Sequence, residues 1–108
     1  MKSLTRKEEL LILTILNLKK DAYLIAITDH LSEVTQKKVS LTSVHAPLSR
    51  LEKHGVIRGQ YGGASAVRGG RRKKIYTVTK LGLELLEDYR RISESLWVNH
   101  LKFSIPKD

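Results

Sequence analysis

Residues 40–55, SLTSVHAPLSRLEKHG, have the features of a helix of about four turns with a defined start and a defined end. The hydroxyl of Ser40 or Thr42 is suited to accept a hydrogen bond from a free N–H group of the first turn. Gly55 suits the left-handed position that ends a helix. Apolar residues recur at helical spacing and predict a face turned toward the core; they are Leu41, Val44, Leu48 and Leu51.

The opposite face of this segment is small and polar, with little negative charge. It carries Thr42, Ser43, His45, Ala46, Ser49, Arg50 and Lys53. Such a face enters a DNA groove without a steric or electrostatic penalty. An ordinary solvated amphipathic helix has the same pattern, so the flanking sequence must discriminate between the two. Pro47 removes one backbone hydrogen bond, and we expect a kink there or a first turn that is not fully α-helical.

The 108 residues suit one domain with a modest core and without a deep catalytic cavity. The absence of cysteine excludes disulfides, thiolate metal sites and thiol nucleophiles, and it fits a reducing cytoplasm. The N-terminal residues lack the features of a signal peptide. No apolar stretch of about 20 residues is present to span a membrane. We therefore expect a cytoplasmic protein without a membrane partner.

The net charge of +9 is concentrated in one segment of the chain. Residues 53–83 contain eight lysines and arginines and no acid, whereas residues 1–52 carry +2 and residues 84–108 carry −1. Five cations lie within the loop at residues 68–74, namely Arg68, Arg71, Arg72, Lys73 and Lys74. Gly69 and Gly70 let this backbone approach a phosphate or a narrow minor groove. The segregated charge favours a polyanionic partner, although a solvated basic hairpin has the same composition.

Other segments also have the periodicity of regular structure: helices are predicted at residues 5–18, 22–35 and 79–100, and hairpin strands at residues 56–61 and 75–78. Thr5 and Glu8 form a capping box for the first helix, and Asp21 and Thr79 are the predicted caps of the other two. The second helix has a predicted buried stripe of Tyr23, Leu24, Ile27, Leu31 and Val34. The fold class is therefore mainly α with a small β-hairpin (α+β), a winged helix-turn-helix followed by a long helix.

The first helix is apolar at almost every azimuth, which is typical of a helix buried on more than one side. So short a chain has little material to cover both sides, and we infer that a second copy covers one of them. A central core helix in a monomer is the alternative. The last helix adds a seam close to coiled-coil spacing. The predicted dimer interface comprises Leu11, Ile12, Ile15, Leu85, Tyr89, Ile92, Leu96 and Trp97.

These patterns divide the chain into residues 1–79 as the winged helix-turn-helix, residues 80–103 as the dimerisation helix, and residues 104–108 as a flexible tail. The four histidines lack metal-binding spacing, the acids form no acid/base pair, and the glycines match no phosphate-binding loop. We predict no enzyme activity, metal or cofactor. Trp97, the only tryptophan, either packs in the core or dimer, or stacks on a flat ligand between two subunits.

Five stretches of the sequence resemble the PadR-like family of bacterial transcriptional regulators, most closely its compact members with one C-terminal helix. They are EELLILTIL (8–16), DAYLIAITDHL (21–31), VSLTSVHAPLSRLEKHGVI (39–57), RGGRRKKIYTVTKLG (68–82) and LW (96–97). The resemblance implies a homodimer in which the last helix of each subunit packs on the first helix of the other. It also implies a repressor whose third helix enters the major groove of a palindromic operator.

In some relatives an aromatic compound in or near the dimer cavity releases the DNA, and the resemblance assigns the stacking tryptophan to Trp97. His45 stands where the family usually has a tyrosine that touches a backbone phosphate, so that role passes to His45. Pro47 is shifted by one position from the proline of many members. Both departures affect the fine chemistry of base reading.

The sequence thus predicts a dimeric repressor that binds double-stranded DNA, and the resemblance adds a small aromatic compound as a candidate effector. Base or adjacent phosphate contacts are expected from Thr42, Ser43, Ala46, Ser49 and Arg50, and backbone contacts from His45, Arg68, Arg71, Arg72, Lys73 and Lys74. A protein-interaction module and a general nucleic-acid or RNA binder are the alternatives. Protein-binding faces present exposed apolar anchors, and RNA readers present exposed aromatics. The outward face of residues 40–55 has neither, which favours DNA.

Overall fold

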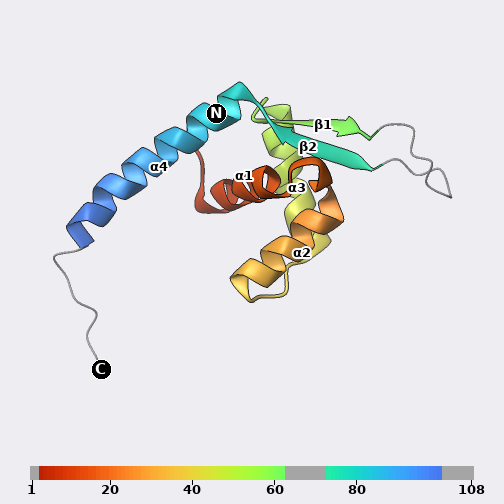
Figure 1. The fold of residues 1–108 in the computed structure, drawn as a ribbon, viewed down its shortest axis with the longest axis horizontal. Coiled ribbons are helices and arrows are strands. Elements are labelled where there is room, and N and C mark those ends of the chain that lie inside the picture. The colour runs from red at the N-terminus through yellow and green to blue at the C-terminus, as the bar shows by residue number, and fades with distance from the viewer. Residues whose placement is uncertain (1–2, 63–72, 101–108) are drawn as a thin grey trace.

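The computed structural model describes residues 3–62 and 73–100. Along the chain the elements are α1 (Arg6–Leu18), a 3₁₀ turn (Lys19–Asp21), α2 (Leu24–Thr35), α3 (Leu41–Lys53), β1 (Ile57–Tyr61), β2 (Lys74–Val78) and α4 (Lys80–His100). The first three helices form a bundle, the hairpin lies along its edge, and α4 extends away as an arm (Figure 1). This arrangement confirms the predicted fold of helices with a small β-hairpin. No helix within the described ranges is long and apolar enough to cross a membrane.

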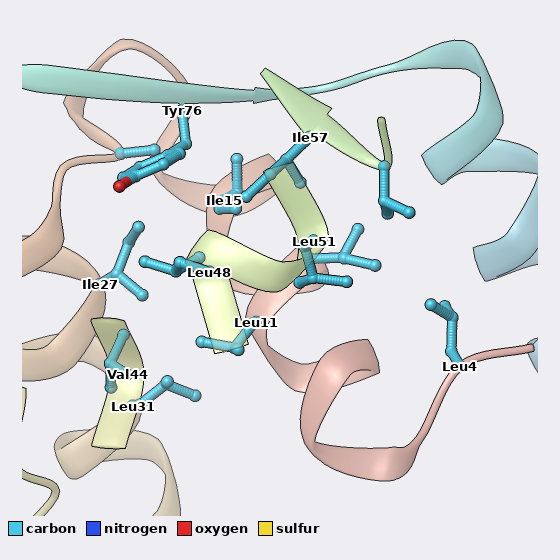
Figure 2. Close-up of a cluster of buried hydrophobic side chains, with 13 residues drawn as sticks. Leu4, Leu11, Ile15, Ile27, Leu31, Val44, Leu48, Leu51, Ile57 and Tyr76 are labelled. Carbon is cyan, nitrogen blue, oxygen red and sulfur yellow. The ribbon is translucent and has the colours of Figure 1, made fainter. Parts of the chain in front are cut away.

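Helix α1 is the centre of the core. Its predicted capping box is present, since Glu8 N–H donates to Thr5 Oγ1 at 3.2 Å and Thr5 N–H donates to Glu8 Oε1 at 2.8 Å. Leu11 and Ile15 point into a cluster with residues of α2, α3 and the hairpin (Figure 2). Because α1 packs against all of these elements, it positions α3 and the hairpin relative to each other.

The start of α2 differs from the prediction. Asp21 lies in the 3₁₀ turn, and the helix begins only at Leu24, with Tyr23 as an N-cap residue whose side chain makes no capping bond. The reason is a contact with the hairpin: Tyr76 N–H donates to Ala22 O at 2.8 Å, and Tyr23 forms a β-bridge with Ile75. Tyr23 is thus extended, and residues 22–23 pair with β2 instead of joining α2.

The predicted buried stripes also extend too far at the turn between α2 and α3. Val34 is 60% exposed and Leu41 is 46% exposed, although both fall on apolar helical faces. They occupy the last turn of α2 and the first position of α3, where the bundle ends. Helical periodicity identifies the face of a residue but does not show how far the neighbouring helices reach to cover it.

Helix α3 has the predicted caps. Ser43 N–H donates to Ser40 Oγ at 3.2 Å, and Gly55 has a φ of +76°. Of the two outcomes expected for Pro47, a first turn that is not α-helical is absent, because α3 is α-helical from Leu41 onward. The kink at Pro47 stays a prediction. The proline is buried, so the apolar contacts of its ring offset part of the cost of the missing hydrogen bond.

Residues 55–56, which follow α3, lie in close backbone contact with residues 79–82 at the start of α4. The hydroxyl oxygen of Thr79 lies 2.6 Å from Gly55 O and 2.9 Å from Val56 O, and it accepts a hydrogen bond from Gly82 N–H at 3.1 Å. A Cβ atom on Gly82 would lie 2.2 Å from Val56 O and 2.7 Å from Val78 Cγ1. Glycine is therefore required in the first turn of α4 because the backbone of residue 56 passes against it. The tail at residues 104–108 lies outside the described residues.

The Gly82 contact predicts the sign of a stability change. Alanine is the better helix former by about 1 kcal/mol, so helix propensity alone would make Gly82→Ala stabilising. We expect the opposite, a loss of about 1–3 kcal/mol in the free energy of unfolding, because the new methyl group overlaps the backbone. Urea denaturation followed by circular dichroism measures the change.

Gly62→Ala is the matched control. Its nearest atoms would lie 3.4 Å from an added Cβ atom, which is ordinary contact. We expect the stability of this variant to stay within about 0.5 kcal/mol of the unchanged protein. A neutral or stabilising Gly82→Ala would show that the backbone of residue 56 leaves room for a side chain at residue 82.

Candidate nucleic-acid interface

The outward face of α3 is available to a partner. Thr42, His45, Ala46, Ser49 and Arg50 are all exposed, as predicted, whereas Ser43 is half-buried. The Ser43 hydroxyl donates to Ser40 O at 2.8 Å, so its proton is already used within the first turn of the helix. The remaining face is small and polar, with Arg50 near its C-terminal end. A surface of this size and polarity fits a major groove.

One flank of α3 faces the hairpin across a groove of about 330 Å³, the wing-side groove. It is lined by Tyr23, Leu24, Ile25, His45, Tyr61, Lys73, Lys74 and Tyr76. His45 and Lys73 were predicted as DNA contacts on separate segments of the sequence, and in the structure both line this groove. Lys73 is exposed, and its Nζ lies 4.1 Å from the centre of the Tyr23 ring. This cation–π contact orients the ammonium group at the groove.

Lys74 was predicted to lie in the basic loop, but it is the first residue of β2. Its Nζ lies 2.8 Å from Glu52 Oε1, and both side chains are half-buried. The hydrogen bond to the Glu52 carboxylate raises the pKa of Lys74 above its ordinary value. The pair links β2 to the last turn of α3. Lys74 therefore has a structural contact within the chain, besides any contact that it makes with DNA. Sequence reasoning missed Glu52 because its partner is 22 residues away on a strand.

Gly59 makes room for this ion pair. A Cβ atom there would lie 2.3 Å from Lys74 Cε and 2.9 Å from Glu52 Oε2. The ammonium group of Lys74 also lies 5.6 Å from the centre of the Tyr76 ring. Burial raises the pKa of the Tyr76 hydroxyl above its ordinary value. The basic residues Arg68, Arg71 and Arg72 of the loop lie outside the described residues.

The predicted dimer residues fall into two groups. Leu11, Ile12 and Ile15 are fully buried within the single chain, so in this structure they cannot contact a second copy. The side of α1 left uncovered carries Leu13 and Leu16, which are 39% and 38% exposed. The physical reason is that Leu11, Ile12 and Ile15 lie on the side of α1 that packs in the core with α2, α3 and the hairpin of the same chain.

Helix α4 presents the second group. Leu85 and Tyr89 are half-buried against the core, whereas Ile92, Leu96 and Trp97 are more than half exposed. Leu85, Tyr89, Ile92 and Leu96 line a mainly apolar groove of about 360 Å³, to which Leu4 also contributes. Trp97 lies beyond the residues that line this groove. The distal half of α4 is therefore an apolar surface that is not covered by the described part of the chain.

Comparison with known proteins agrees with this geometry. The sequence matches the model of the PadR-like family of transcriptional regulators over residues 12–88. A PadR-like transcriptional regulator from Bacillus cereus is similar in structure, with 25% identity, a TM-score of 0.67, and coverage of 92% of this chain and 96% of that chain. The comparison with curated proteins found no match.

Two further solved structures share the fold at lower identity. A transcriptional regulator from Clostridium thermocellum has 22% identity and a TM-score of 0.67, and the match covers 93% of each chain. MepR from S. aureus, solved as a DNA complex, has 17% identity and a TM-score of 0.64, and the match covers 94% of this chain and 67% of that one. Because the family model covers most of the sequence, the chain belongs to the PadR-like family of transcriptional regulators.

Proposed function

We propose that this protein is a homodimeric repressor that binds a palindromic operator in double-stranded DNA. The observation that carries the proposal is the exposed, small and polar face of α3 beside a groove that holds His45 and Lys73. The family consists of transcriptional regulators rather than enzymes. The similar MepR structure was solved as a DNA complex, which supports DNA as the partner of this fold.

In the proposed complex α3 lies in the major groove. Thr42, Ala46 and Ser49 are short enough to let the helix axis approach the base edges. Arg50, on the flank away from the hairpin, reaches a guanine or the adjacent phosphate. His45 and Lys73 hold the backbone on the hairpin side, and Arg68, Arg71 and Arg72 of the loop extend that contact toward the minor groove.

The dimer of the proposal uses the apolar surface left on each subunit. Leu13 and Leu16 on α1 and Ile92 and Leu96 on α4 are exposed, although they are large and apolar. Exposed large apolar side chains on two helices favour association. A two-fold dimer in which α4 of one subunit covers α1 of the other would bury all four. It would also present two copies of α3 to half-sites about 34 Å apart.

Two other functions remain as alternatives. A protein-interaction module would use the basic face to bind an acidic protein, and a general nucleic-acid binder would recognise phosphates without reading bases. Both would show no preference among DNA sequences. The preference for one sequence is therefore the property that separates the proposed repressor from the alternatives.

The deciding experiment is a fluorescence-anisotropy titration at several salt concentrations. It compares DNA from the region upstream of the protein's own coding sequence with scrambled DNA of equal length. We expect binding to the upstream DNA to be tighter by about a hundredfold or more. We also expect two chains per duplex, and sedimentation of the free protein as a dimer. Equal binding to both DNAs that disappears as salt rises would refute the repressor and leave a general polyanion binder.

Arg50 provides a sharper test of base reading. Arg50→Lys keeps the positive charge but loses the planar fork that binds guanine at two points. If Arg50 reads a base, Arg50→Lys should retain binding to scrambled DNA and lose about 1–3 kcal/mol of preference for the operator. Arg50→Ala should lose both. An Arg50→Lys variant with unchanged preference would make Arg50 a phosphate contact.

The effector of the proposal is a flat aromatic compound that stacks on Trp97. Trp97 is more than half exposed on the proposed dimer helix, and it is the only tryptophan in the chain. We expect some member of a diverse set of aromatic compounds to quench its fluorescence at submillimolar concentration. Calorimetry with Trp97→Ala should then show no binding of the same compound. If no compound quenches the fluorescence, Trp97 serves packing only.

A further inference from the structure

A second basic groove lies on the other flank of α3, and nothing described so far uses it. This turn-side groove, of about 500 Å³, is formed by the start of α1, the end of α2 and the start of α3. Lys7, Lys37 and Lys38 contribute its charge, Ser40 and Ser43 add hydroxyls, and no acid is among its lining residues. Its lining includes the turn that precedes α3. That turn and the hairpin, which follows α3 along the chain, are separate segments of the fold (Figure 1).

The three lysines are uncompensated. All three side chains are exposed, and none forms an ion pair with an acid in the described part of the chain. Lys74 on the hairpin, by contrast, is held by Glu52. Three like charges that converge on one groove from separate elements repel each other, and an anionic partner would remove that repulsion.

The turn that carries Lys37 and Lys38 has a fixed conformation. Val39 N–H donates to Ser32 Oγ at 3.0 Å, and the Ser32 hydroxyl donates to Thr28 O at 3.0 Å. Gln36 has a φ of +59°, the left-handed conformation that reverses the chain after α2, and its side chain donates to Glu33 O at 2.9 Å. The lysine backbones are thus positioned in advance, and a ligand has little backbone to order on binding.

The two basic grooves lie on opposite flanks of the reading face. At about 100° per residue, His45 falls on one flank of α3 and Ser43 on the other. The structure agrees with this, because His45 lines the wing-side groove and Ser43 lines the turn-side groove. Thr42, Ala46 and Ser49 are exposed between them. A helix in a major groove has one sugar-phosphate backbone on each side, since both strands border that groove.

We propose that Lys7, Lys37 and Lys38 form a second phosphate-binding site, which takes the DNA strand opposite the one held by the hairpin. This inference rests on the proposed function, since it assumes that α3 enters the major groove. The second site adds to the proposed interface a surface formed by α1 and by the turn between α2 and α3. The basic loop at residues 68–74 is not part of it. Operator affinity then depends on cations on both sides of α3.

The experiment combines a lysine variant with a modified operator. Lys37→Gln/Lys38→Gln should weaken operator binding by about tenfold or more near 0.1 M salt, and it should lower the salt slope by close to one unit for each phosphate that the variant no longer neutralises. Single neutral methylphosphonate groups are then placed along each strand of the operator. At the phosphate bound by the lysines, on the strand opposite the hairpin, the substitution should weaken the unchanged protein but have no further effect on the variant.

Arg90→Gln/Arg91→Gln on α4 is the matched control, because it removes the same charge from an exposed pair of neighbouring cations. It should bind the operator like the unchanged protein and show the full methylphosphonate effect. Thermal unfolding should confirm that Lys37→Gln/Lys38→Gln is folded, since both side chains are exposed.

The outcomes separate this inference from the proposed function. If the unchanged protein does not distinguish operator from scrambled DNA, the repressor itself is refuted. If it does so, but the lysine variant has the same affinity and salt slope and every methylphosphonate weakens both proteins equally, the second phosphate site is wrong. The turn-side groove, with Leu10 and Val39 among its lining residues, would then be assigned to an acidic protein segment.

Discussion

The fold depends on the close approach of two backbone segments, residues 55–56 between α3 and β1, and residues 79–82 at the start of α4. Thr79 N–H donates to Val56 O at 3.1 Å, and the Thr79 hydroxyl reaches the carbonyl groups of Gly55 and Val56. Gly82 allows this distance because it has no side chain to separate the segments. One junction therefore closes the hairpin, ends α3 and sets the direction in which α4 leaves.

The hairpin is also tied to the helices at its middle. Ala22 and Tyr23 pair with β2 ahead of α2, and Glu52 holds Lys74 at the last turn of α3. Glu52 is the only acid in α3, a helix that otherwise presents a neutral and basic face. An acid there costs some attraction to a polyanion, but it fixes the angle between α3 and the hairpin. A ligand that contacts both elements then meets a surface that is already ordered.

Local patterns in the sequence predicted the parts of the structure that local interactions determine. The capping box at Thr5, the Ser40 cap, the left-handed Gly55 and the two strands of the hairpin each follow from a few neighbouring residues. The exposed face of α3 followed in the same way, because its periodicity separates two chemically different sides. These features include most of the candidate site.

The errors concern contacts between distant segments. The pattern of α1 could not show which of its apolar sides faces its own core, so Leu11 was assigned to a dimer although it is fully buried in the chain. Residues 22–23 have a helical pattern, but they pair with β2 and lie outside α2. Helix propensity makes Gly82 a weak position, whereas its contact with residue 56 makes it necessary. Each of these outcomes depends on a partner that belongs to another element of the fold.

The distribution of charge around α3 follows from the two tasks of a DNA-binding surface. Phosphate contacts supply affinity that falls with salt, and base contacts supply discrimination. The central part of α3 carries small uncharged residues, and the exposed lysines lie at its flanks, Lys73 on the hairpin and Lys37 on the turn. In the proposed complex, cations in place of Thr42, Ala46 and Ser49 would bind phosphates of every DNA sequence and hold the helix against the backbone. Cations placed to either side instead centre the helix over the groove, where its short side chains meet the bases.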